Sequence, residues 1–94
     1  MGEVKTIHPY VTKTVEILNG EPIIKETRIS VRSVVQYVLK YGMTPEEFTK
    51  EFSNIELAAI YDALSYYYDN KDEIDLLIEE NKEDKWKGTF KENT

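Results

Sequence analysis

Two short blocks of turn and cap residues constrain the fold more than any other feature of this sequence. Residues 20–31 read GEPIIKETRISV, and residues 41–48 read YGMTPEEF. In the second block Gly42 suits a left-handed helix stop, and Thr44 with Glu47 suits the capping box of a new helix. The two blocks therefore predict where a strand gives way to a helix and where one helix ends and the next begins.

Apolar spacing places helices after these signals. Ser30 is a good N-cap, and the spacing of the apolar residues that follow it predicts a helix over residues 31–41. A second helix begins after Thr44 and presents Phe48 and Phe52. The expected core stripe of the first helix is Val31, Val34, Val35, Val38 and Leu39.

A third helix follows residues 53–54, and it carries two apolar strips. The first is predicted to face the core and consists of Leu57, Ile60, Tyr61, Leu64 and Tyr68. The second combines small residues with tyrosine, which allows another helix to approach closely. It is predicted as a dimer contact and consists of Ala59, Ala63, Tyr66 and Tyr67. A fourth helix is expected over residues 71–81.

The sequence before Ser30 indicates a small β element. Residues 13–17 alternate like a strand, residues 18–20 contain an Asn-Gly turn, and residues 22–24 resume an extended path. The predicted fold class is mainly α, a helix-turn-helix-like bundle of three to four helices with a short N-terminal β-hairpin or extended pair. The predicted organisation is a flexible arm at 1–12, one globular domain at 13–81 and a charged tail at 82–94.

Composition argues against an enzyme. The chain has no Cys and one His, His8, so disulfides and zinc sites are not expected. No nucleophile with a plausible base and no phosphate loop is present, so we expect neither catalysis nor a cofactor or metal. The N-terminus lacks a signal-peptide layout and no apolar run approaches a membrane span, which predicts a cytoplasmic protein without a membrane partner.

Charge is divided unevenly along the chain. Residues 1–50 carry 7 Lys/Arg and 6 Asp/Glu, whereas residues 51–94 carry 5 and 12. The predicted third helix would repel phosphates, so any DNA contact must come from the hairpin and first helix. The candidate DNA-binding residues are Lys13, Lys25, Arg28 and Arg32. For Arg28 and Arg32 the favoured reading is an ordinary surface cation or a local salt-bridge partner, and contact with DNA is the alternative.

The tail combines aromatic and basic residues, as segments that fold on binding often do. The candidate partner-binding residues are Lys85, Trp86, Lys87 and Phe90. Docking of Trp86 onto the fourth helix of the same chain is the alternative.

Residues 17–74 resemble domain-of-unknown-function family 433, a group of small prokaryotic proteins. The resemblance rests on a Thr-Arg-Ile block paired with a Gly-x-x-Pro-Glu-Glu turn; where the family commonly has Gly before Thr-Arg, this chain has Glu26. The matching residues are Gly20, Pro22, Ile24, Thr27, Arg28, Ile29, Val31, Gly42, Pro45, Glu46, Glu47, Ile55, Ile60, Ala63, Leu64 and Tyr66.

This resemblance implies a helix-turn-helix-like domain, a homodimer and pairing with a PIN-like nuclease toxin. The expected function is therefore a non-enzymatic, antitoxin-like binding protein. A DNA-binding transcriptional regulator of helix-turn-helix type is the alternative, and a structural dimer module is a third reading.

Overall fold

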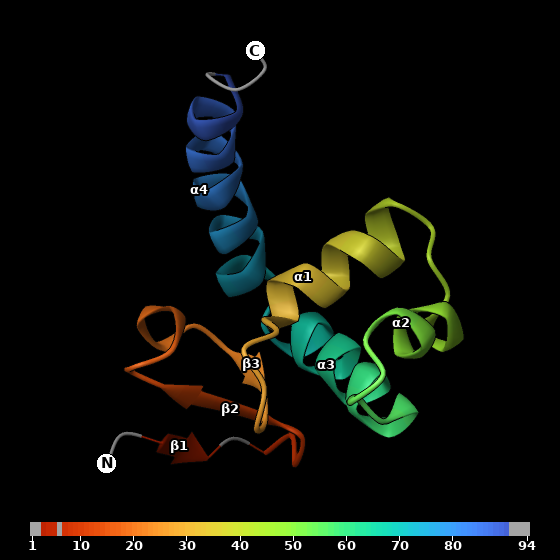
Figure 1. The fold of residues 1–94 in the computed structure, drawn as a ribbon. Helices are drawn as coiled ribbons and strands as arrows, with labels where there is room; N and C mark the ends of the chain where they lie inside the picture. The colour runs from red at the N-terminus through yellow and green to blue at the C-terminus, as the bar shows by residue number, and fades with distance from the viewer. Residues whose placement is uncertain (1–2, 6, 91–94) are drawn as a thin grey trace.

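The fold is a helical bundle that packs against a small antiparallel sheet (Figure 1). It is seen in a computed structural model that describes residues 3–5 and 7–90, with side chains from residue 7 to residue 81. The sheet contains β1 (Glu3–Lys5), β2 (Val11–Thr14) and β3 (Ile23–Ile24), in the order β1-β2-β3. The mainly α class with a short β element is thus confirmed.

The sheet corrects the predicted position of the first strand. The alternating segment 13–17 was expected to be the strand, but β2 begins at Val11, and Thr12 pairs with Ile23 and with Lys5 on its two sides. The predicted arm boundary at residue 12 is therefore wrong, because residues 3–5 and 11–12 belong to the sheet. Val11 and Thr12 are buried, and this burial fixes the register more firmly than the alternation of the half-buried and exposed residues after them.

Left-handed residues turn the chain after β2, as the Asn-Gly signal predicts. Asn19 has φ 55° and Gly20 has φ 82° within the short 3-10 turn η1 (Leu18–Gly20). Leu18 also has a positive φ, of 49°. The chain then enters β3 in extended conformation, as expected from Pro22 onward.

The first helix has two parts with different hydrogen bonding. Ser30 caps α1 (Val31–Val35) by accepting a hydrogen bond from Ser33 N at 3.0 Å, as predicted. The chain continues as the π-helical segment η2 (Gln36–Lys40), in which Tyr41 N donates to Gln36 O. Wider turns shift the phase of the side chains, so Leu39 is 43% exposed and the prediction that it joins the core is wrong.

The second helix agrees closely with its sequence signals. Thr44 caps α2 (Pro45–Glu51), Glu47 N donates to Thr44 Oγ1, and Thr44 N donates to Glu47 Oε1. Gly42 has φ 81°, the left-handed stop that the sequence predicts. Phe48 from α2 is fully buried in the core.

The last two helices complete the bundle. α3 (Leu57–Asp69) crosses beneath α1, and α4 (Lys71–Phe90) packs its first turns against them and then rises away from the body of the molecule (Figure 1). Ile74 and Ile78 are the buried residues of α4. Its backbone is helical well past the predicted end at residue 81. Among the described residues, no helix combines the length and apolar composition needed to cross a bilayer.

Candidate functional site

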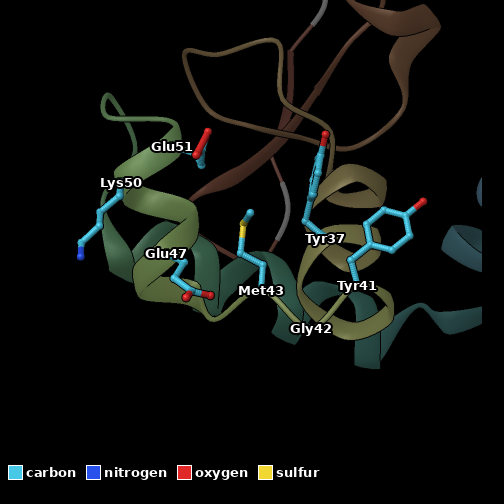
Figure 2. A pocket seen from close by; sticks show the side chains of 7 residues that line it. All are labelled: Tyr37, Tyr41, Gly42, Met43, Glu47, Lys50 and Glu51. Carbon is cyan, nitrogen blue, oxygen red and sulfur yellow. The ribbon is translucent and has the colours of Figure 1, made fainter.

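An open groove lies between the end of η2 and α2, and its volume is about 580 Å³. We call it the tyrosine groove. Figure 2 shows its lining residues, which are Tyr37, Tyr41, Gly42, Met43, Glu47, Lys50 and Glu51.

The π-helical turn builds one wall of the tyrosine groove. Tyr37 and Tyr41 are four residues apart, and their rings meet edge to face with centroids 5.8 Å apart. The left-handed Gly42 then reverses the chain, and Met43 N donates to Tyr37 O at 2.9 Å. This wall is therefore held by backbone hydrogen bonds as well as by ring contacts.

Core aromatics support this wall from behind. The Tyr37 ring lies edge to face with Phe48, at 5.9 Å between centroids, and is tilted against Phe52 at 6.1 Å. Phe48 is fully buried, so Tyr37 rests on a rigid base. Tyr41, in contrast, is 68% exposed and can contact a ligand.

Carboxylates from α2 form the opposite wall. Glu47 and Glu51 lie four residues apart on one side of the helix, and Oε1 of Glu47 is held by Thr44 N at 2.9 Å. Lys50 lines the rim, but Figure 2 shows its side chain pointing away from the two tyrosines. The groove thus combines an aromatic wall, a flexible thioether and two acids, a composition suited to binding a cationic or amphipathic group.

The second notable surface is the exposed side of α3, and it corrects the predicted dimer contact. Ala59, Ala63, Tyr66 and Tyr67 are buried inside this chain, with Ala63 fully so. Small residues at 59 and 63 allow α1 to approach α3, so the strip predicted to meet a second chain instead meets the valines of the same chain.

Most of the strip predicted as core consequently faces outward. Tyr61 and Tyr68 are 51% and 59% exposed, and Leu57 is also exposed; only Ile60 of that strip is fully buried, and Leu64 is half-buried. We call the outward side the α3 outer face, and it consists of Leu57, Ala58, Tyr61, Leu64, Ser65 and Tyr68.

Two of the four candidate DNA-binding cations are engaged within the chain. Arg32 donates two hydrogen bonds to Glu21, from Nε to Oε1 at 3.1 Å and from Nη2 to Oε2 at 3.0 Å. Lys13 Nζ lies 3.0 Å from Glu73 Oε2. Burial alone would lower the pKa of Lys13, but Glu73, with Tyr66, raises that pKa above its ordinary value. Both cations therefore fasten elements of the fold together.

The other two, Lys25 and Arg28, are exposed on the turn after β3. Thr27 shapes this turn, because its hydroxyl donates to Ile24 O at 2.8 Å and accepts from Ile29 N at 2.9 Å. Glu26 lies in the left-handed region with φ 64°. The Thr-Arg-Ile block is thus a turn motif that leaves Arg28 in solvent.

The candidate partner-binding residues lie at the far end of α4. Lys85, Trp86, Lys87 and Phe90 are in its helical backbone, but their side chains lie outside the described residues. Residues 91–94 of the predicted tail also lie outside the described part of the chain.

A buried histidine contact was missed by the sequence analysis. His8 Nδ1 lies 3.3 Å from Asp62 Oδ1, and Nε2 lies 3.0 Å from Asp69 Oδ2. Tyr10 N donates to Asp62 Oδ2 at 2.7 Å, so the segment before β2 is fastened to α3. The spacing of Asp62 and Asp69, seven residues apart on one helix side, was the available signal. Among the described side chains, no group of three or more His, Cys, Asp or Glu is arranged to hold a metal ion.

The geometry can be compared with known proteins. Residues 11–67 match the family described as "Protein of unknown function (DUF433)". The chain belongs to this family. A search of the curated proteins finds no match. The DUF433 match includes the tyrosine groove, the Thr27 turn and most of α3, whereas β1 and α4 lie outside it.

A solved structure supports the same assignment. The chain is similar to a DUF433 member protein from Anabaena variabilis, whose crystal structure matches with a TM-score of 0.69 at 26% sequence identity. The match covers 73% of this chain and 67% of that one. The DUF433 fold is therefore shared by the two proteins.

Proposed function

We propose that this protein is a non-enzymatic, antitoxin-like binding protein of the cytoplasm that forms a homodimer and binds a nuclease-type toxin. The observation that carries the proposal is the α3 outer face, a continuous uncharged surface on a chain in which 32% of residues are charged. Uncharged apolar surface rimmed by polar residues is typical of protein interfaces.

The sequence of the α3 outer face is suited to self-pairing. Leu57, Tyr61, Leu64 and Tyr68 are spaced by four, three and four residues, which reads the same in both directions. In an antiparallel pair related by a two-fold axis, Leu57 of one copy faces Tyr68 of the other, and Tyr61 faces Leu64. Asp62, the one charged residue between Leu57 and Tyr68, is turned toward His8. The paired faces therefore bring no like charges directly together.

Dimerisation is tested by mass measurement in solution over a wide range of concentrations. A seam of four large side chains per copy is smaller than a standard interface, so we expect a dissociation constant on the order of 10 μM. Tyr61→Asp places two carboxylates near the axis and should give a monomer, while Tyr41→Asp, at an exposed tyrosine outside α3, should leave the dimer intact. A wild-type chain that stays monomeric at the highest concentration would refute the dimer.

The far end of α4 supports the toxin-binding half of the proposal. α4 rises away from the bundle and carries Lys85, Trp86 and Lys87 toward its end (Figure 1). A PIN-like nuclease holds its metal with carboxylates, and these lysines would meet that acidic centre while Trp86 anchors the segment.

Toxin binding is tested by co-purification with a PIN-like nuclease encoded beside this chain. The full chain should retain the nuclease, and the triple variant K85A, W86A, K87A should lose it while Lys82→Ala should not. Equal retention by the triple variant would remove the end of α4 from the proposal.

DNA binding is the second candidate, and the exposed pair Lys25 and Arg28 favours it. A promoter fragment of the chain's own operon should then bind with a strong dependence on salt. Arg28→Ala should weaken binding at all sequences and reduce the salt slope by about one phosphate contact. Absence of binding at low salt would exclude this candidate.

A further inference from the structure

We propose that the tyrosine groove captures an arginine side chain of a partner protein. This surface is separate from the α3 outer face and from the end of α4, so the inference goes beyond the proposed function and is tested independently of it.

The aromatic wall offers a stacking surface for a planar cation. Tyr41 is largely exposed while Tyr37 is packed against Phe48 and Phe52, so the wall offers one accessible ring backed by a second ring that the core supports. A guanidinium group stacks on tyrosine faces because the ring face is electron-rich. Met43 lies between the tyrosines and α2 in Figure 2, where its flexible side chain can adjust to the methylene stem of an arginine.

The acidic wall supplies the matching charge. Glu47 and Glu51 both line the groove, and the Lys50 side chain points away from the two tyrosines (Figure 2). Arginine presents several donors in one plane and can bind a carboxylate with two hydrogen bonds while its face stays on a ring, which lysine cannot do. Charge complementarity and the flat aromatic wall together favour arginine over an apolar side chain or a second copy of this acidic chain.

Local backbone structure keeps the groove open before any ligand binds. The π-helical hydrogen bond from Tyr41 N to Gln36 O, the left-handed Gly42 and the Thr44 capping box fix both walls. Binding then costs little rearrangement, and affinity is limited mainly by the openness of the site.

The experiment is an NMR titration of the full chain with N-acetyl-arginine methylamide, with the citrulline analogue as a neutral control of the same shape. We expect shifts of the Tyr37 and Tyr41 ring signals and the Met43 methyl signal, with a dissociation constant on the order of 1 mM. The citrulline analogue should shift these signals at least about tenfold more weakly.

Variants locate the effect. Glu51→Gln and Tyr41→Leu should each weaken arginine binding by about three- to tenfold, whereas Glu46→Gln, which removes an exposed carboxylate of α2 outside the groove lining, should leave it unchanged. Glu47 is avoided because it closes the capping box. Equal shifts with citrulline, shifts outside the groove, or no response at saturating probe would each overturn the proposal. None of these results depends on whether the chain dimerises or binds a toxin.

Discussion

Glu26 has a backbone conformation that disfavours its own side chain. Its φ of 64° lies in the left-handed region, where a residue with a Cβ is strained by about 1 kcal/mol. The turn is kept because Thr27 closes it with two side-chain hydrogen bonds. The turn therefore keeps its shape in spite of the strain at Glu26.

Glu26→Gly should accordingly stabilise the protein by about 1 kcal/mol, because glycine adopts this φ without strain. The measurement is the free energy of unfolding in denaturant. Lys25→Gly is the matched control in the same turn, and it should destabilise, since residue 25 does not have a positive φ. A loss of stability in Glu26→Gly would contradict the strain argument.

His8 is the residue that sequence reasoning placed least well. A single histidine in a polar N-terminal segment gives no periodic signal, and only the folded chain brings it between Asp62 and Asp69. His8→Ala removes both contacts and leaves Asp62 and Asp69 without their imidazole partner. It should lower the free energy of unfolding by about 2 kcal/mol.

Ile7→Ala is the control for this variant, because the neighbouring Ile7 is 86% exposed and its truncation should be nearly neutral. Thermal unfolding of both variants makes the comparison. Equal losses would mean that His8 contributes through general packing of the segment and not through its two carboxylate contacts.

Helix ends were predictable from local chemistry, whereas helix faces were not. The Ser30 cap, the Gly42 stop and the Thr44 capping box all form as expected, because each depends only on residues close in sequence. The buried face of α3 depends on which helix packs against it. Two strips of α3 were apolar enough to be buried in the core. The strip with the smaller side chains, at residues 59 and 63, is the buried one because it lets α1 approach closely. The tyrosine groove was not predicted because it depends on a π-helical turn, and no local sequence pattern indicated that turn.

Ala63→Leu tests this account of α3. Ala63 is fully buried, so a larger side chain must displace α1 and should cost about 1–3 kcal/mol in the free energy of unfolding. Ala58→Leu on the exposed side of the same helix is the control and should change stability by less than about 0.5 kcal/mol. Stability equal to wild type in Ala63→Leu would mean that the core has room at this position.

At the scale of the whole molecule, tyrosine hydroxyls join α3 to the start of α4. Tyr66 donates to Glu73 Oε1 at 2.7 Å, and Tyr67 donates to Asp75 Oδ1 at 2.8 Å. Burial, followed by the hydrogen bond and charge of the carboxylate, raises the pKa of both phenols above 10.0. Lys13, from β2, reaches the same Glu73 and so links the sheet to this junction.

These raised pKa values predict that the stability of the protein falls in alkaline solution. The phenols ionise at lower pH in the unfolded chain than in the folded one. Their contribution to the free energy of unfolding is therefore fully present below about pH 10 and is lost as pH rises beyond it. The raised pKa of Lys13 acts in the same direction. Tyr67→Phe should lower stability at neutral pH and flatten its decline in alkali. Denaturant midpoints between neutral and alkaline pH measure this, with Tyr41→Phe as the exposed control; an unchanged slope in Tyr67→Phe would contradict the assignment.

Because α4 extends away from the bundle, the charge at its far end is separated from the charge of the rest of the molecule. From Ile78, its last described buried residue, the helix continues to Phe90, about 18 Å at 1.5 Å per residue. That reach exceeds the screening length of roughly 8 Å in physiological salt. Residues 82–90 of α4 hold one more lysine than acids, whereas residues 1–81 are strongly anionic. A molecule that contacts the end of α4 therefore meets a helix with a small net positive charge. The negative charge of the rest of the molecule is largely screened by salt at that distance.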